Sequence, residues 1–317
     1  MIAQKKYHFQ DHKILCLGLK GPIDEHVASY PIYREVHGWE KKLRKLQEHL
    51  KWKDMTRWYH PGWTKIVQDF DTVVISDGLR GRDIIDFIHS KNPQMRIIIY
   101  YLNTKMDRGV NHPCWYQGLG CEFYSFDRKN ATDFGLPFKH FCYPYYREER
   151  KAAMKGDAYD VFFVGEDKGR YPELMQLKAQ LLQMGMKPRF LIKRGKHIRY
   201  YGKKRKNTMA EAVPYEQVLD EIGKSRAVLE IVQEGQHGIT YRAMEALLWE
   251  KKLITNFQEI KDYDFYCPEN VFILGEQEIG ELPSFLSRPM KPVDEAIKEQ
   301  YLPEGWMEEF FTTYAPK

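Results

Sequence analysis

Two successive series of short apolar runs, alternating with helical patterns, constrain this chain more than any other feature of its sequence. The runs are rich in Ile, Val, Phe and Tyr, and apolar residues between them recur at helical spacing, as at Ile84, Ile85 and Ile88. Such alternation is typical of βα units and parallel sheets. The sequence therefore predicts an α/β protein with two Rossmann-like domains.

Each series predicts five strands. The first series places them at Lys13–Leu19, Thr72–Ser76, Arg96–Leu102, Glu122–Phe126 and Phe138–Tyr143. The second series places them at Tyr159–Val164, Pro188–Ile192, Ala227–Val232, Leu253–Thr255 and Val271–Leu274. Helices are predicted at Arg82–Ser90, Tyr171–Met184, Tyr215–Ile222 and Ile239–Glu250.

The two series meet at Tyr143–Ala158, which is charged and lacks strand periodicity. We therefore expect domains 1–150 and 151–317, with the extreme C-terminal helix left free to cross back to the first. In parallel α/β domains, ligands bind beyond the carboxyl ends of the strands. Functional residues are expected directly after strands.

Composition limits the class of protein. Hydrophobic residues make up 43% and charged residues 29%, which excludes a disordered or fibrous chain. Met1–Lys13 is polar and basic, and no apolar run approaches the length of a membrane span. The five cysteines form an odd set without a CxxC pair, which favours a reducing compartment. We expect a cytoplasmic protein.

The net charge of +5 is concentrated in one segment. Eight basic residues and no acidic one lie in Lys193–Asn207, interleaved with Tyr200 and Tyr201. A solvated loop, a diphosphate, an anionic membrane or a nucleic acid would each suit this segment. A second basic segment, Trp39–Lys53, carries an apolar helical stripe, which suits either a membrane interface or ordinary core packing.

The stretch Ala227–Asn256 is the most informative for chemistry. It predicts a strand, a glycine-containing loop, a helix and another strand. Gly238 lets a ligand approach the backbone, and the start of a helix suits a phosphate. Thr240 and Arg242 would add a hydroxyl and a guanidinium to that anion site. Glu245 lies one turn further, where its carboxylate can accept hydrogen bonds from a ribose diol.

At these residues the chain resembles a known family. The run GxTxRxxEAL at 238–247, followed by KKLITN, resembles the donor-binding segment of GT-B glycosyltransferases of the group 1 and CgeB-like kind. Tyr159–Arg170 is similar to the strand and loop that open their C-terminal domain. Phe123–Phe138 is similar to a segment near the end of their N-terminal domain. The resemblance spans roughly residues 70–275.

The resemblance implies two Rossmann-like domains that face a central cleft, with a nucleotide-sugar donor held by the C-terminal domain and an acceptor by the N-terminal one. It assigns Gly165 and Arg170 to the phosphate side, Gly238, Thr240 and Arg242 to the pyrophosphate, and Glu245 to the ribose. Many retaining members carry a glutamate eight positions before the last of these. Here that position is His237, which leaves the stereochemical outcome open and suggests a phosphate donor instead.

An acceptor hydroxyl needs a base, which in such enzymes usually comes from the N-terminal domain. Asp24 and His26 follow the first predicted strand, and Asp77 lies directly after the second. The DxD sequences at 69–71 and 262–264 are interpreted as surface carboxylates. We expect no metal and no cofactor, with the diphosphate balanced by arginine and a helix dipole.

These expectations combine into a hexosyltransferase-like enzyme that moves a sugar from a nucleotide diphosphate to a glycan or lipid-linked acceptor. The resemblance alone implies a setting in bacterial surface polysaccharide biosynthesis. Peripheral contact with the inner face of the cell membrane is left open, and no nucleic acid partner is expected. The alternatives are a nucleotide-sugar epimerase or hydrolase of the same fold, and a nucleic-acid-binding or scaffold protein that uses residues 193–207.

Overall fold

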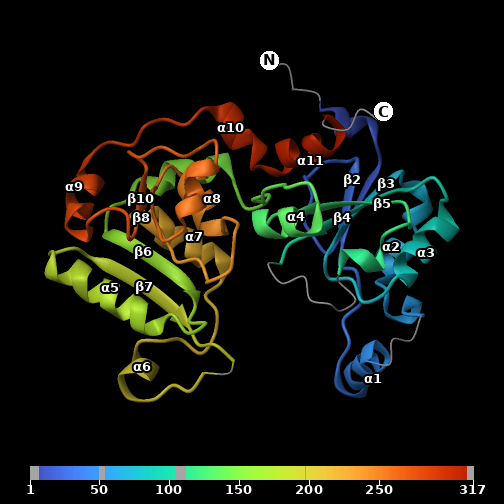
Figure 1. The fold of residues 1–317 in the computed structure, drawn as a ribbon, viewed down its shortest axis with the longest axis horizontal. Coiled ribbons are helices and arrows are strands. Elements are labelled where there is room, and N and C mark those ends of the chain that lie inside the picture. The colour runs from blue at the N-terminus through green and yellow to red at the C-terminus, as the bar shows by residue number, and fades with distance from the viewer. Residues whose placement is uncertain (1–6, 50–53, 104–111, 197, 313–317) are drawn as a thin grey trace. The chain divides into compact units, whose positions relative to one another are not determined.

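A computed structural model describes residues 7–49, 54–103, 112–196 and 198–312. The chain forms two compact units (Figure 1). The first contains Met1–Pro144, Gly235–Gly238 and Glu299–Lys317, and the second contains Tyr145–Glu234 and Ile239–Lys298. The chain thus first changes unit at Tyr145, close to the expected boundary near residue 150. In these ranges no helix combines the length and the apolar character that crossing a membrane requires.

The first unit contains a parallel five-stranded sheet in the order β2-β1-β3-β4-β5. Its strands are β1 (Ile14–Leu17), β2 (Val27–Tyr30), β3 (Thr72–Ser76), β4 (Arg96–Tyr101) and β5 (Cys121–Ser125). Every residue of β1 and β3 is buried. Strands buried on both faces are typical of parallel sheets that are covered by helices on each side.

Helices cover both faces of this sheet. The α-helices of the unit are α1 (Gly38–His49), α2 (Pro61–Thr64), α3 (Asp83–Lys91), α4 (Arg128–Phe134) and α11 (Pro303–Thr312). Alternate strand residues point to opposite faces, so Leu15 and Leu17 share a core with Ile84 of α3. Cys16 shares the other core with Trp306 of α11. The C-terminal helix α11 therefore packs on the first sheet.

The second unit contains another parallel five-stranded sheet, in the order β10-β9-β8-β6-β7. Its strands are β6 (Tyr159–Glu166), β7 (Pro188–Lys193), β8 (Ser225–Glu230), β9 (Lys252–Thr255) and β10 (Val271–Ile273). Its α-helices are α5 (Tyr171–Gln183), α6 (Gly202–Lys206), α7 (Tyr215–Gly223), α8 (Tyr241–Leu248), α9 (Leu282–Ser287) and α10 (Glu295–Gln300). Leu174, Leu177 and Leu181 lie on one face of α5 and pack into the core of this sheet.

The prediction of an α/β protein with two Rossmann-like parallel sheets is confirmed. Two predictions about strands are wrong. Phe138–Tyr143 forms only one bridge, to Ser125, because its carbonyl groups accept hydrogen bonds from the side chains of Tyr100 and Trp306. The edge strand β2 was missed because its sequence, VASY, is neither continuously apolar nor clearly alternating.

Candidate functional site

Both sheets have the same internal strand order, which places a candidate site in each. Numbered within its own unit, each order reads 2-1-3-4-5. In open parallel sheets of this order, the connections leave the first and third strands in opposite directions, and ligands bind beyond the carboxyl ends of these two strands. The two positions are the carboxyl ends of β6 and β8 in the second unit, and of β1 and β3 in the first.

Arg170 joins β6 to β8 at the site of the second unit. Its guanidinium donates hydrogen bonds to the carbonyl oxygens of Glu166 at 2.7 Å, of Asp167 at 3.4 Å, and of Ile231. Burial lowers the pKa of this guanidinium. A Cβ at Gly165 would lie 3.1 Å from the ring of Phe163 and, at 3.5 Å, in ordinary contact with Arg170 Nη2, so Gly165 and Arg170 lie side by side. Gly165 and Arg170, both predicted on the phosphate side, therefore lie together. The hydrogen bonds of Arg170, however, mainly connect the ends of β6 and β8.

Asp167 is a buried residue of this candidate site that the sequence reasoning missed. It is fully buried, and its Oδ1 accepts a hydrogen bond from the backbone N–H of Tyr171 at 2.8 Å. Its Oδ2 accepts one from the Tyr200 hydroxyl at 2.7 Å and lies 3.0 Å from Lys204 Nζ. Burial acts to raise the pKa of this carboxyl, but the hydrogen bonds outweigh burial and hold it below its ordinary value. An aspartate between a strand and the proline of a helix start was the available signal.

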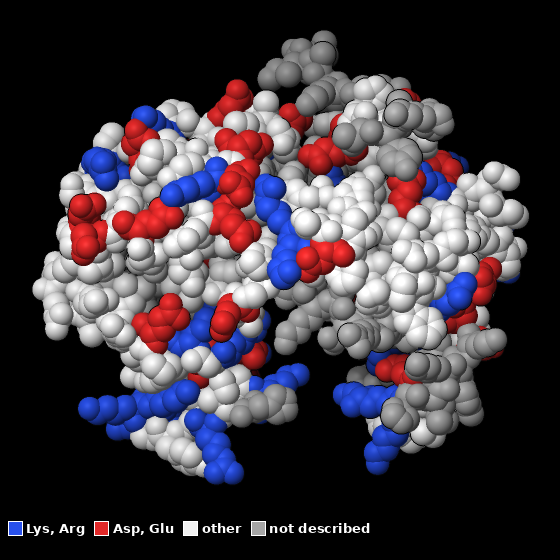
Figure 2. Space-filling view, viewed as in Figure 1, with Lys and Arg blue, Asp and Glu red and all other residues white. Residues whose placement is uncertain are grey.

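The basic segment is consequently held at the carboxyl edge of the second sheet. Arg194 Nη2 donates to the carbonyl oxygen of Arg205 at 3.0 Å, which folds the segment back on itself. Figure 2 shows Lys and Arg side chains projecting from the region of α6. Tyr201 is 73% exposed beside them. Except for His197, which lies outside the described residues, the segment is an ordered cationic surface.

Glu230 fixes the start of α8. This buried residue ends β8, and its Oε1 accepts hydrogen bonds from the backbone N–H of Thr240 at 2.9 Å and from its hydroxyl at 2.7 Å. Its Oε2 accepts one from the Thr255 hydroxyl at 2.8 Å. Thr240 Oγ1 in turn caps the helix by accepting from the N–H of Arg242 at 3.0 Å. Thr240 is thus engaged as a helix cap, and its contact with a pyrophosphate stays a prediction.

Glu245 is enclosed between two partners. Its side chain has no exposed surface, and the Tyr215 hydroxyl donates a hydrogen bond to its Oε1. Its Oε2 lies 2.5 Å from Arg242 Nη1, although the pair lacks hydrogen-bond geometry. Burial raises the pKa of Glu245 to about 7, against the attraction of Arg242. A carboxylate enclosed in this way positions Arg242, and its contact with a ribose stays a prediction.

Residues 235–238 group with the first unit. The backbone N–H of His237 donates to Asp127 Oδ2 at 2.8 Å, while Oδ1 of the same aspartate caps α4. A Cβ at Gly238 would lie 2.8 Å from the ring and the carbonyl oxygen of Phe126. Close packing against protein therefore accounts for this glycine, which was predicted to approach a pyrophosphate. The backbone N–H of His237 is likewise engaged by a residue of the first unit, Asp127.

Asp77 lies at the switch point of the first sheet, directly after β3. Its side chain is buried, and its Oδ2 accepts hydrogen bonds from Asn103 N at 3.0 Å and Nδ2 at 2.7 Å. Burial raises the pKa of this carboxyl. A Cβ at Gly18 would overlap Ser76 Oγ, so the ends of β1 and β3 approach closely here. The chain continues from Asn103 into residues 104–111, which are outside the described ranges.

Asp24 and His26 lie at the other end of this sheet. The carbonyl oxygen of His26 accepts a hydrogen bond from the N–H of Ile14, the first residue of β1. Asp24 Oδ2 accepts from Gln10 Nε2 at 2.8 Å, and its Oδ1 from the N–H of His26 at 2.8 Å. Because β2 was missed, both residues were expected after a strand. They precede β2 instead, which removes the positional argument for either as a base.

No protein-family model and no curated protein matches the chain. Among solved structures, the spinosyn forosaminyltransferase SpnP is similar at a TM-score of 0.42 and 11% identity, over 92% of this chain and 87% of that one. The S. aureus MnaA–UDP co-structure is similar at a TM-score of 0.42 and 9% identity, over 95% of each chain. At these values the likeness carries no argument about activity.

Proposed function

We propose that the protein is a glycosyltransferase that transfers a sugar from a nucleotide diphosphate to a glycan or lipid-linked acceptor. The observation that carries this proposal is the balance of charge at the carboxyl edge of the second sheet. Asp167, Glu230 and Glu245 are all buried there and engaged by hydroxyl or cationic partners. These three carboxylates therefore do not compete with a ligand for the exposed part of Arg242, as an anion site requires.

Arg242 is the proposed ligand of the diphosphate. Its side chain is 16% exposed, and the buried Glu245 fixes its direction from one helical turn away. Arg170 uses three of its N–H groups on backbone carbonyls and has two more for a phosphate. Together with the start of α8, these arginines would stabilise the leaving diphosphate, which is the role a metal ion fills in other transferases.

Asp77 is the proposed base for the acceptor hydroxyl. It ends a strand at the switch point of its own sheet, and two hydrogen bonds from Asn103 fix one of its carboxylate oxygens. A carboxyl whose pKa is raised by burial is better matched to proton transfer near neutral pH. Asp77→Asn should lower kcat by about 10²- to 10⁴-fold and leave nucleotide affinity unchanged.

Calorimetry with UDP, GDP, ADP and CMP tests the donor site. We expect one nucleotide to bind, and Arg242→Ala to weaken it by about tenfold or more, because charged hydrogen bonds contribute about 1.5–3 kcal/mol. Arg189→Ala is the matched control, since Arg189 also pairs with a buried glutamate, Glu221, but at the start of β7. Equal affinity in wild type and Arg242→Ala would refute the donor site.

Incubation with nucleotide sugars in the absence of acceptor separates transfer from its rivals. A transferase should leave the donor intact, whereas an epimerase or hydrolase of the same fold would convert it. Replacing Lys203, Arg205 and Lys206 by Ala should leave nucleotide affinity unchanged. Loss of the protein's activity with nucleotide affinity intact, together with loss of nucleic acid binding, would favour the scaffold alternative.

A setting at the inner face of the bacterial membrane, in surface polysaccharide biosynthesis, is part of the proposal. Exposed Tyr201 beside the cations of α6, and exposed Trp39 and Leu46 on the basic helix α1, are residue types that suit an anionic interface. Residues 50–53 of the predicted basic helix lie outside the described residues. Co-sedimentation with phosphatidylglycerol vesicles, lost in Tyr201→Ser and Trp39→Ser, tests this contact.

A further inference from the structure

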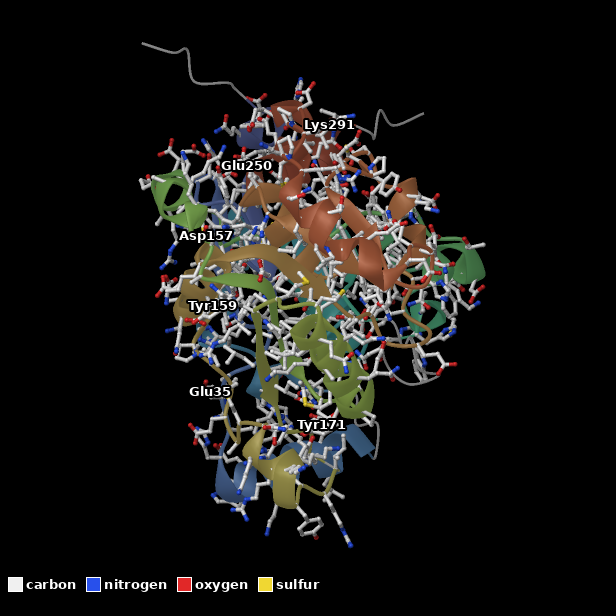
Figure 3. All side chains as sticks on the ribbon, turned by 90° about the vertical axis from the view of Figure 1, so that its left-hand side faces the viewer. Glu35, Asp157, Tyr159, Tyr171, Glu250 and Lys291 are labelled. Carbon is white, nitrogen blue, oxygen red and sulfur yellow. The ribbon has the colours of Figure 1, made fainter. Side chains whose placement is uncertain are left out.

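The amino ends of β6, β8 and β9 form the edge of the second sheet opposite to the proposed donor site. Figure 3 shows Asp157 and Glu250 at one end of this unit and Tyr171, which follows the carboxyl end of β6, at the other. A hollow of about 550 Å³ opens at the amino edge. Three acidic side chains line it, with six cationic ones: Lys151, Lys155, Arg226, Lys251, Lys252 and Arg288. The lining therefore has a net positive charge.

Two consecutive lysines of this lining are buried without a carboxylate partner. Lys251 is 6% exposed and Lys252 4% exposed, and neither forms an ion pair with any described residue. The amino group of Lys251 donates to the carbonyl oxygens of Gly223 at 3.1 Å and Ser225 at 2.7 Å, and that of Lys252 to two other carbonyls. Buried lysines are normally paired with an anion. Here Asp157 attracts Lys251 and Glu269 attracts Lys252 without forming an ion pair with it, so the six cations of the lining outnumber its three carboxylates.

Burial lowers the pKa of both lysines to about 8. For Lys252, repulsion by Arg288 and Arg226 adds to the effect. A bound anion would offset the cost of keeping both ammonium groups charged. Two further cations are accessible to it, because Lys155 and Arg288 are exposed and neither pairs with a carboxylate in the described part of the chain.

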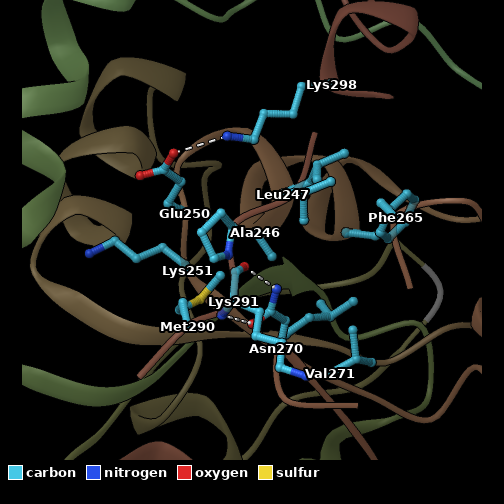
Figure 4. Close-up of a pocket in the computed structure, with 14 residues that line it drawn as sticks. Ala246, Leu247, Glu250, Lys251, Phe265, Asn270, Val271, Met290, Lys291 and Lys298 are labelled. Atoms are coloured by element: carbon cyan, nitrogen blue, oxygen red, sulfur yellow. Dashed lines mark hydrogen bonds and ion pairs between the residues drawn. The ribbon is translucent and has the colours of Figure 1, made fainter. Parts of the chain in front are cut away.

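An apolar cavity of about 150 Å³ adjoins the hollow, and the two share Glu250, Lys251 and Met290 as lining residues. Figure 4 shows this cavity between the end of α8 and the segment that carries Met290 and Lys291. Its apolar lining includes Ala246, Leu247, Leu253, Phe265, Val271 and Val293. A cavity of this volume can hold a group as large as benzene.

Glu250 lies where the two cavities meet, in a backbone conformation that disfavours it. Its φ of 52° is left-handed, and among the described non-glycine residues only Lys168 also has a positive φ. Glycine is preferred at this position after a helix, and another residue costs about 1 kcal/mol. Here the Glu250 carboxylate forms ion pairs with two lysines: it lies 3.0 Å from Lys151 Nζ and 2.9 Å from Lys298 Nζ. Strain of this kind is concentrated at functional sites.

We propose that the hollow and the cavity form one binding site for a phosphate monoester of a small apolar group. Lys155, Arg288 and the amino groups of Lys251 and Lys252 would hold the phosphate, and the cavity beside Leu247 and Phe265 would hold the apolar group. A phosphate monoester carries nearly two negative charges at neutral pH, which suits the unpaired cations. This site is independent of the proposed donor site, because it lies at the other edge of the sheet.

Calorimetry of the full chain with phenyl phosphate tests the site, because this probe joins a phosphate dianion to a benzene ring. We expect binding, and a loss of about tenfold or more in affinity when Lys155→Ala and Arg288→Ala are combined. Both side chains are exposed, so the variant should fold. The matched control combines Lys187→Ala with Arg199→Ala, two exposed cations of the same unit outside the hollow, and should bind like wild type.

Two further measurements test whether the apolar cavity contributes to binding and whether the site is separate from the proposed donor site. Inorganic phosphate should bind about tenfold more weakly than phenyl phosphate, and Arg242→Ala should leave phenyl phosphate affinity unchanged. The proposal is overturned if phenyl phosphate does not bind, if it binds no more tightly than inorganic phosphate, or if the combined variant at residues 155 and 288 binds it like wild type. It is also overturned if Arg242→Ala abolishes binding, because the probe would then occupy the donor site.

Discussion

At the carboxyl edge of the second sheet three buried carboxylates have hydroxyl or cationic partners, whereas at the amino edge two buried lysines are hydrogen-bonded to backbone carbonyls. Asp167, Glu230 and Glu245 belong to the first set, and Lys251 and Lys252 to the second. These carboxylates stabilise loops and orient cationic side chains. The lysines add to a lining in which cations outnumber carboxylates, which a bound anion would balance. One sheet thus has two edges suited to anions for different physical reasons.

The largest expected effect comes from the most connected carboxylate. Glu230→Ala leaves the N–H and hydroxyl of Thr240 and the hydroxyl of Thr255 without their acceptor, so we expect the free energy of unfolding to fall by about 3–4 kcal/mol. Urea unfolding measures it. Glu216→Ala is the control, because Glu216 pairs with Arg150 at the surface and should cost about 1 kcal/mol or less. Equal losses would contradict a scaffold role for Glu230.

Glu245→Gln should remove the fall in the free energy of unfolding that the wild type shows between pH 4.5 and about pH 7. Because the folded-state pKa of Glu245 is about 7 against 4.5 unfolded, the wild type loses stability as pH rises through this window. The amide cannot ionise, so the variant should gain up to about 3 kcal/mol relative to wild type at pH 8 and nothing at pH 4. Unfolding curves at the two pH values measure this. A constant difference across the range would show that Glu245 titrates normally.

Lys251→Met tests a pH dependence of stability with the opposite sign, because burial lowers the pKa of Lys251. With a folded-state pKa of about 8 against 10.5 unfolded, Lys251 makes the wild type more stable as pH rises from 8 to 10.5. The variant lacks this gain, so its stability relative to wild type should be about 2 kcal/mol less favourable at pH 9.5 than at pH 7. Thermal unfolding at both pH values decides it. No change with pH would mean that the ammonium is not destabilised by burial.

The smallest expected loss of stability is confined to the basic segment at residues 193–207. Asp167→Asn weakens the contacts with Tyr200 and Lys204 that hold the basic segment, at a cost of about 1 kcal/mol. Trypsin should then cut within 203–206 about five times faster, because cleavage follows the population of the open segment. Asp160→Asn, near the other end of β6, is the control and should leave this cleavage rate unchanged.

The sequence predicted elements better where both faces of a strand are buried. Thr72–Ser76 was predicted with its observed bounds because a continuous apolar run is a strong signal. The edge strand β2 has no such run, and missing it misplaced Asp24 and His26. For the site, the pattern identified Thr240, Arg242 and Glu245 as a group and the family resemblance added Arg170, but neither could tell ligand from scaffold. Hydrogen bonds within the fold engage Thr240 and one carboxylate oxygen of Glu245, and no spacing rule contains that information.

The sequence by itself determined two parallel α/β sheets, the segment that begins α8, and the place of Asp77 after a strand, because periodicity and strand ends are local properties. Only the tertiary structure decided the strand order and therefore the switch points. It also showed that Asp167, Glu230 and Glu245 at the carboxyl edge of the second sheet are buried and that Lys251 and Lys252 are buried without forming an ion pair in the described part of the chain. Burial and pairing depend on residues far apart in the chain, and they decide which charges remain available to a ligand.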